Sequence, residues 1–276
     1  MSALKIAVLD MNNNQPNQGM RCIMQLIRTV QASEQTELAF DIFNVRGNNE
    51  VPGLDYDVYI SSGGPGSPLA STEPWEARFF TLIDALFAWN QANDQKKFVF
   101  LICHSFQLVV RHLELGLLSK RRSTSFGILP MHKEAAGLTE PLFDGLGEPF
   151  YAVDSRDYQI TKPNKAKLGA MGGAILCREK IRPHVPLDRA IMGIRFSPEI
   201  VGTQFHPEAD NQGMLMYFKT EERRLQVVRN FGQQKYDDMV EYLLDPTKIA
   251  LTESVILPSF LRQALAAKKA GQPALA

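Results

Sequence analysis

The sequence has little that would mark a secreted, membrane-bound or nucleic-acid-binding protein. Cysteine is scarce, with three residues in 276 and no Cys-x-x-Cys pair, which excludes a disulfide framework and is typical of reduced thiols in a cytoplasmic protein. Neither sign of charge is in excess, since 30 basic residues balance 30 acidic ones, and nothing predicts binding to nucleic acid or an anionic membrane. No apolar run approaches the length of a membrane span, and the N-terminus lacks a secretory pattern. We therefore expect a cytoplasmic protein.

Short apolar runs alternate with helical patterns over the first 116 residues. The runs typical of buried strands are 5–11, 38–45, 55–60 and 98–102. Apolar residues recur at helical spacing within 20–30, 74–87 and 104–113. This order predicts an α/β fold built on a doubly wound, mostly parallel sheet.

The pattern changes after residue 123. Shorter β-like pieces follow at 124–129, 150–153, 169–176, 190–196 and 200–205. They indicate a partly antiparallel region of the same domain, and the pattern becomes helical again after Glu208. We predict one domain over 1–210 and a helical extension over 211–276 that packs on this domain or on a partner, with disorder over 268–276.

A glycine-rich segment, Ser62-Gly-Gly-Pro-Gly-Ser-Pro68, directly follows a predicted strand. Adjacent glycines allow positive φ angles and a close approach of the backbone to a ligand, and their N–H groups can stabilise an oxyanion. A phosphate-binding loop is less well matched, because the segment has no Gly-Lys-Ser/Thr and Pro65 lacks an N–H donor. A plain tight turn is the better explanation of this segment when it is taken alone.

Cys103 ends the most continuous apolar run and precedes a helical pattern. A cysteine at such a strand-to-helix elbow would present its sulfur at the carboxyl edge of the sheet, where α/β folds bind ligands. The adjacent helix N-terminus favours a thiolate. The alternative is a buried structural cysteine, which is our interpretation of Cys22 and Cys177.

His206 and Glu208 lie two residues apart in Gly202-Thr-Gln-Phe-His-Pro-Glu208. In an extended segment both side chains project to the same side, so the carboxylate could orient the imidazole. The imidazole could then take a proton from a thiol and return it to a leaving amine. A surface turn is the alternative for this segment alone, but the three segments together have the order and spacing of a Cys-His-Glu triad.

The three segments resemble the signature segments of the class I (triad) glutamine amidotransferases, such as the glutaminase domain of GMP synthase. The matches are Gly63–Pro68, Cys103 with Gln107, and Thr203–Glu208, and the resemblance covers about residues 4–210. It implies a flavodoxin-like sheet and hydrolysis of the glutamine side-chain amide through a γ-glutamyl thioester on Cys103.

The resemblance also implies a role for each matching residue. Cys103 would be the nucleophile, His206 the general base and acid, and Glu208 the group that orients His206. The N–H groups of Gly64 and His104 would form the oxyanion hole. Gly63, Gln107 and Asp157 would contact the substrate, although Ser155 stands where many members have a histidine near this pocket.

The elbow departs from the family pattern Gly-x-Cys-x-Gly, because this chain has Leu101-Ile-Cys-His-Ser105. Both glycines that relieve crowding at the turn are replaced. The bulky Leu101 could hold the strand and the helix further apart. His104 could support a thiolate if it were charged, or it could simply cover the pocket.

Glutamine hydrolysis is the leading functional hypothesis, with glutamine as substrate and no cofactor or metal, because His132 and His184 have no partners at ligand spacing. Residues 211–276 are too few for an ammonia-accepting module, so we expect a separate synthetase subunit to receive the ammonia. The apolar faces of the last helices could also form a homodimer. The alternatives are a Cys-His-Glu acyltransferase, against which the glycine turn argues, a γ-glutamyl hydrolase, and a catalytically impaired binding or regulatory module.

Overall fold

The computed structural model describes residues 3–271, except for the side chains at 217 and 223. The strands are β1 Leu4–Asp10, β2 Leu38–Asn44, β3 Val58–Ser61, β4 Phe98–Ile102, β5 Leu117–Lys133, β6 Phe150–Thr161, β7 Ala174–Glu179, β8 Ile191–Arg195 and β9 Ile200–Thr203. The helices are α1 Gln18–Glu34, α2 Val45–Asn48, α3 Pro74–Ala92, α4 His104–His112, α5 Ala135–Leu138, the 3-10 helix η1 Pro141–Phe143, α6 Lys165–Ala170, α7 Asn211–Lys219, α8 Glu221–Phe231, α9 Gln233–Leu244 and α10 Ile249–Ala270.

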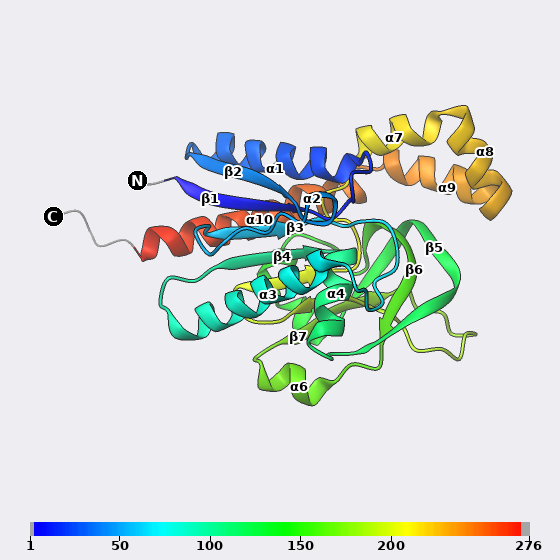
Figure 1. The fold of residues 1–276 in the computed structure, drawn as a ribbon. Coiled ribbons are helices and arrows are strands. Elements are labelled where there is room, and N and C mark those ends of the chain that lie inside the picture. The colour runs from blue at the N-terminus through cyan, green and yellow to red at the C-terminus, as the bar shows by residue number, and fades with distance from the viewer. Residues whose placement is uncertain (1–2, 272–276) are drawn as a thin grey trace.

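The strands form one sheet in the order β2-β1-β3-β4-β9-β8-β7-β5-β6. Strands β2, β1, β3, β4 and β9 are parallel to one another. The remaining pairs, β9–β8, β8–β7, β7–β5 and β5–β6, are antiparallel. Helices cover both faces of the parallel part (Figure 1). The predicted doubly wound α/β fold is confirmed, together with its partly antiparallel second half.

The parallel strands are apolar on both faces because each face is covered by helices. Alternate residues such as Ile60 and Phe100 face one core with α1 and α10, and their neighbours Tyr59 and Leu101 face the other with α3 and α4. The apolar face of α1 is fully used, since its helically spaced side chains are buried. Pro74 begins α3, where its missing N–H costs nothing.

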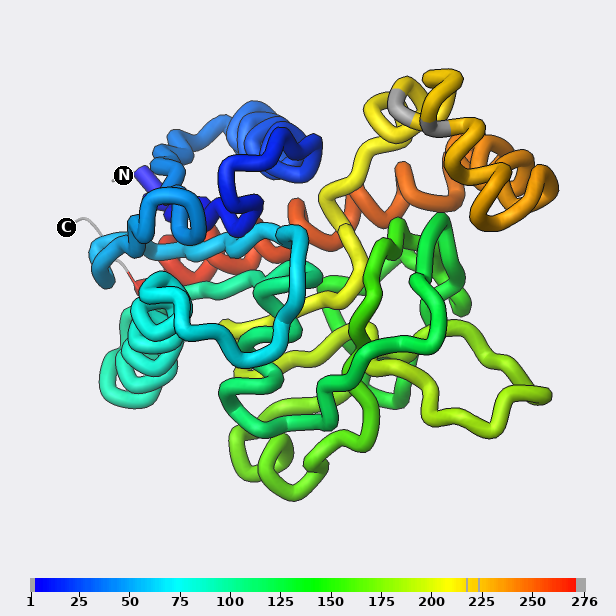
Figure 2. Tube along the Cα trace, turned by 45° about the vertical axis from the view of Figure 1, so that its right-hand side comes forward, coloured from blue at the N-terminus to red at the C-terminus, as the bar shows by residue number. Residues whose placement is uncertain are grey.

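The elements described after residue 210 are helices. Helices α7, α8 and α9 enclose a third apolar cluster with the long β5–β6 pair, and Figure 2 shows this helical group beside the green strands. Helix α10 lies along the sheet next to α1. The division of the chain at residue 210 stays a prediction. None of the described helices is long and apolar enough to cross a membrane.

The predicted disorder of residues 268–276 is wrong for its first part. Helix α10 continues to Ala270, and Lys268 Nζ donates to the Ala3 carbonyl at 2.8 Å and pairs with Asp57 at 2.7 Å. This ammonium ties the end of the helix to the start of the sheet. Residues 272–276 lie outside the described part of the chain.

Candidate active site

Cys103 occupies the sharp turn between β4 and α4. Its backbone has φ 48° and ψ −96°, and a positive φ is uncommon for a residue that carries a side chain. The turn is held from both sides, because the Cys103 N–H donates to the Thr203 carbonyl at 2.7 Å and the Cys103 carbonyl accepts from the Gln107 N–H at 3.0 Å. Strained backbone persists only where the surroundings over-determine it, and it clusters at functional sites.

The two residues that replace the family's elbow glycines are both accommodated. Ser105 is fully buried, and its hydroxyl accepts from the Ile102 N–H at 2.9 Å and donates to the Ser61 carbonyl at 3.0 Å. Leu101 pairs in register with Gly202 of β9, which has no side chain to oppose it. The chain therefore forms the elbow without the two glycines, and its small residues are Ser105 on α4 and Gly202 on the neighbouring strand.

His206 and Glu208 follow β9 and project toward the elbow. The His206 N–H donates to the Val153 carbonyl at 2.9 Å, which fixes the backbone of the segment. The ring Nδ1 lies 2.8 Å from Glu208 Oε1, and Glu208 is only 2% exposed. Its second oxygen, Oε2, has no hydrogen-bond partner within the described residues. The carboxylate is therefore aimed at the imidazole rather than at solvent.

Gly63 makes the meeting of Cys103 and His206 possible. A Cβ atom on Gly63 would lie 2.8 Å from His206 Cε1 and 3.4 Å from Cys103 Cβ. The first distance is shorter than real contacts allow, so a larger residue would push the imidazole away from the elbow. The structure thus brings together Gly63, Cys103, His206 and Glu208.

The environment of His206 favours its charged form. Burial opposes the charge, but the negative charges of Glu208 and Cys103 and their hydrogen bonds outweigh it, so that the pKa of His206 is raised well above its usual value. An imidazolium beside a cysteine sulfur is an arrangement that activates thiol nucleophiles.

Gln107 lies in the site but is committed to protein contacts. Its Nε2 donates to Gln204 Oε1 at 2.7 Å and to the Tyr158 carbonyl at 3.2 Å. Gln204 in turn directs Nε2 at the Cys103 sulfur, 3.5 Å away. Sequence reasoning gave Gln204 no role, although its position two residues before His206 in an extended segment was the available signal.

The predicted oxyanion-hole residues flank the elbow. A Cβ on Gly64 would lie 2.1 Å from the Met11 carbonyl oxygen, so only glycine fits there. Arg46 holds this turn by donating to the carbonyls of Pro65 at 2.6 Å and Met11 at 3.0 Å. His104 begins α4, whose first N–H groups have no partner inside the helix. The use of the two N–H groups as oxyanion donors stays a prediction.

The His104 side chain cannot supply the positive charge considered from the sequence. The residue is 2% exposed, and its Nε2 has no hydrogen-bond partner among the described residues. Burial, followed by the nearby charges of Arg46 and Arg111, lowers the pKa of His104 to about 3. The imidazole is therefore neutral at physiological pH and covers the elbow as a packing group.

Asp157 lies on β6, exposed, where its Oδ1 accepts from Thr124 Oγ1 at 2.5 Å. None of the contacts described for the chain joins it to Cys103 or His206, and its role in substrate binding stays a prediction. Ser155, on the same strand, lines a cavity of about 530 Å³ that reaches His206 and Glu208. Apolar side chains of Phe126, Val153, Met214 and Phe218 form much of its wall.

A family model described as glutamine amidotransferase class-I matches residues 25–220. The chain belongs to the class I glutamine amidotransferase family. This confirms the predicted family and includes the glycine turn, the elbow and the His206–Glu208 segment. Among the described residues of this amidotransferase-family chain, no group of three or more His, Cys, Asp or Glu side chains could hold a metal ion.

Solved structures of similar fold cover nearly the whole chain. A glutamine amidotransferase from Thermotoga maritima gives a TM-score of 0.64 at 13% identity, over 96% of this chain and 99% of that one. One from Methylobacillus flagellatus gives 0.62 at 13%, over 94% and 95%. The glutaminase domain of Trypanosoma brucei CTPS with bound acivicin gives 0.55 at 12%, over 94% of each chain. At these identities the likeness shows the fold alone. A search of curated protein sequences gave no match.

Proposed function

We propose that this protein hydrolyses the side-chain amide of glutamine with Cys103 as the nucleophile. The observation that carries the proposal is geometric: the hydrogen-bonded His206–Glu208 pair lies beside a cysteine that is held in a strained elbow. Family membership supports the same chemistry.

In the proposed reaction the Cys103 sulfur attacks the amide carbon of glutamine and a C–S bond forms. The negative charge on the carbonyl oxygen is stabilised by the N–H groups of Gly64 and His104. His206, which holds the thiol proton, gives it to the leaving nitrogen as the C–N bond breaks, so that ammonia departs and a γ-glutamyl thioester remains. Glu208 keeps Nδ1 of the ring engaged, which leaves the other ring nitrogen for proton transfer.

The second half of the reaction uses the same groups. His206, now neutral, takes a proton from water as the water oxygen attacks the thioester carbon. The C–S bond then breaks and glutamate is released, with the proton returned to the Cys103–His206 pair. We further propose that the ammonia passes to a separate synthetase subunit in the cytoplasm, and that a homodimer or this partner covers the site.

The test measures glutamate released from glutamine by the purified chain and by its Cys103→Ala variant. Cys177→Ala is the matched control, because Cys177 is a fully buried cysteine of the core that takes no part in the triad. Release should be lost in the first variant and kept in the second. A diazo-ketone glutamine analogue, and acivicin as a second probe, should label Cys103 and leave Cys177 unmodified. A folded protein that neither releases glutamate nor reacts with either probe would contradict the proposal.

The cavity beside His206 favours a second candidate function, in which Cys103 attacks a γ-glutamyl amide other than glutamine. Its volume of about 530 Å³ is larger than ammonia requires as a leaving group, and much of its wall is apolar. A γ-glutamyl amide of a larger, apolar amine would fill it. Higher kcat/KM for γ-glutamyl-alkylamides than for glutamine would favour this candidate, whereas release of CoA from an acyl-CoA would favour the acyltransferase alternative. No turnover of any of these compounds would favour the binding or regulatory module.

A further inference from the structure

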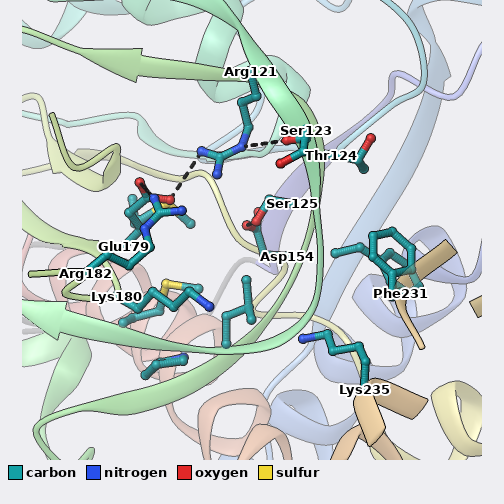
Figure 3. Close-up of a pocket in the computed structure, with 15 residues that line it drawn as sticks. Arg121, Ser123, Thr124, Ser125, Asp154, Glu179, Lys180, Arg182, Phe231 and Lys235 are labelled. Atoms are coloured by element: carbon teal, nitrogen blue, oxygen red, sulfur yellow. Dashed lines mark hydrogen bonds and ion pairs between the residues drawn. The ribbon is translucent and has the colours of Figure 1, made fainter. Parts of the chain in front are cut away.

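A second cavity, of about 180 Å³, lies between the β5–β6 pair, the segment after β7 and helix α9 (Figure 3). Its lining is rich in charge and hydroxyl groups. The basic side chains are Arg121, Lys180, Arg182 and Lys235, and the acidic ones are Asp154 and Glu179. Ser123, Thr124 and Ser125 of β5 lie along one wall.

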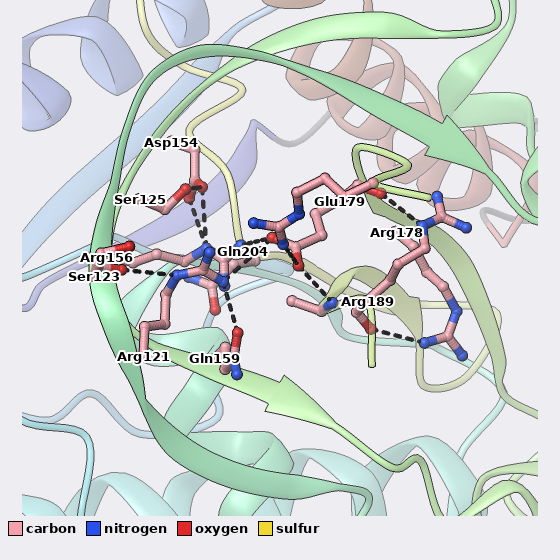
Figure 4. Close-up of polar contacts among 12 residues, drawn as sticks. Arg121, Ser123, Ser125, Asp154, Arg156, Gln159, Arg178, Glu179, Arg189 and Gln204 are labelled. Carbon is pink, nitrogen blue, oxygen red and sulfur yellow. Dashed lines mark hydrogen bonds and ion pairs between the residues drawn. The ribbon is translucent and has the colours of Figure 1, made fainter. Parts of the chain in front are cut away.

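The two carboxylates are already neutralised by arginines. Asp154 accepts from Arg156 Nε at 3.0 Å and from Ser125 Oγ at 2.6 Å. Glu179 accepts from Arg156 at 3.0 Å, from Arg121 at 3.2 Å and from Arg182. Figure 4 shows Arg121, Arg156, Asp154 and Glu179 gathered in one network. The arginines thus already offset the charge of both carboxylates, and any further cation of the lining adds to an excess.

Lys180 and Lys235 are two such cations. Neither has a hydrogen bond or ion pair to any residue that the structure describes, and Figure 3 shows their side chains extending toward each other across the cavity. With Arg121 and Arg182, they give the lining of the cavity four cations against two carboxylates. The lining thus carries an excess of two positive charges.

Strand β5 makes room for Lys235. A Cβ on Gly127 would lie 2.8 Å from Lys235 Nζ and 3.0 Å from its Cε, so the glycine lets the lysine lie against the strand. Burial, followed by repulsion from Lys180, lowers the pKa of Lys235 and outweighs the opposing charges of Asp238 and Asp154. An ammonium partly removed from water beside a like charge is unfavourable without a counter-ion. An anion bound between Lys180 and Lys235 would balance the charge of the buried ammonium and offset the repulsion between the two lysines.

We propose that this cavity binds the phosphate group of a small ligand. Lysine and arginine are common phosphate-binding side chains, and an excess of two positive charges suits a dianion better than a single carboxylate. The Ser123 hydroxyl, which has no side-chain partner within the described residues, is a further donor. The volume is below that of pockets for drug-sized molecules, so the cavity holds little more than the phosphate itself. The source is either free phosphate or a phosphorylated small molecule whose remainder projects to solvent.

The experiment is calorimetric titration of the full chain with inorganic phosphate, AMP and acetate. Lys235→Gln and Lys180→Gln are the test variants, because neither lysine supports another group of the fold. Lys120→Gln is the matched control, since Lys120 neighbours Arg121 on β5 but does not line the cavity. Thermal unfolding verifies that all three variants fold.

Phosphate or AMP should bind saturably, and each test variant should lose affinity by about tenfold or more while the control keeps it. Tighter binding of AMP than of phosphate would assign the site to a phosphorylated molecule, and the reverse would assign it to free phosphate. The proposal is overturned if neither binds, if acetate binds as tightly as phosphate, or if Lys120→Gln loses as much affinity as the test variants. None of these outcomes depends on glutamine hydrolysis.

Discussion

Leu101 of β4 and Gly202 of β9 form a complementary pair across the parallel sheet. They stand opposite each other in register, and a Cβ on Gly202 would lie 3.1 Å from Leu101 Cβ and 2.8 Å from the ring of Phe106. The small residue that the family places before its nucleophile is thus found on the neighbouring strand.

Gly202→Ala should therefore destabilise the protein by about 1–3 kcal/mol, because the added methyl overpacks the contact with Leu101 and Phe106. Gly169→Ala is the control, since no heavy atom lies within 4 Å of its Cβ and alanine favours the helix there. Urea unfolding of both variants measures the difference. Equal stability of Gly202→Ala and the natural chain would show that the elbow tolerates the methyl.

Glu208→Gln should lower the pKa of His206, because it removes a negative charge that favours the imidazolium. A histidine whose pKa is raised by folding stabilises the protein fully below its unfolded pKa, about 6.5, and this contribution is lost as pH rises through the folded pKa. The natural chain should therefore exceed the variant in stability most below pH 6.5. NMR titration of the five histidines, with urea unfolding at several pH values, measures both effects. An unchanged His206 pKa in the variant would contradict the pairing.

His104→Met should make the protein less sensitive to acid. The folded pKa of about 3 lies below the unfolded value of about 6.5, so the unfolded chain takes up this proton first as pH falls. The loss of stability attributable to His104 would reach about 1.4 kcal/mol per pH unit within that window. The variant's stability should fall less steeply between pH 6.5 and 4. The same slope in both proteins would mean that His104 titrates normally in the fold.

Gln107→Leu should slow alkylation of Cys103 by iodoacetamide roughly twofold to tenfold, because Gln204 loses the donor that holds its amide toward the sulfur. Iodoacetamide has no amino-acid group for Gln107 to bind. A change in the alkylation rate therefore reports on how Gln107 positions Gln204, and not on contact between Gln107 and the substrate. Gln234→Leu on the exposed face of α9 is the control. If only the KM for glutamine changes, Gln107 holds the substrate, as the family resemblance implies.

Arg156→Met should cost about 3–5 kcal/mol of stability, because it leaves the buried Asp154 without its cation and removes one from Glu179. Lys167→Met breaks an exposed pair with Glu114 and should cost no more than about 1 kcal/mol. Chemical denaturation at neutral pH measures both. Similar small losses would show that solvent reaches the network.

The sequence predicts most strands and helices of the parallel half of the sheet, but few of the strand and helix boundaries in the antiparallel half. The run 98–102 has the bounds of β4, because a strand buried on both faces is apolar throughout. Strand β5 spans Leu117–Lys133, whereas only 124–129 was predicted, since its basic start at Lys120 reads as a solvated loop. The predicted strand at 169–176 is wrong in its first part, where α6 ends at Ala170 and β7 begins only at Ala174. At the start of β5, Arg121 pairs with the distant Glu179, which lets a basic segment lie in a strand. Between α6 and β7, Gly172 has a φ of 73° and forms a turn that the apolar pattern does not reveal.

By itself, the sequence determined the chemistry that Cys103, His206 and Glu208 can offer, because side-chain identity and a two-residue spacing are local properties. Only the tertiary structure decided how these groups are placed. It set the positive φ at Cys103, the clearance at Gly63 that lets His206 reach the elbow, and the Gln107–Gln204 contact that ends on the sulfur. It also left Lys180 and Lys235 facing each other with no direct ion pair to either among the described residues. Such relations join residues that lie far apart in the sequence, such as Gly63 and His206. Burial and close packing, which no local pattern encodes, fix which of them meet.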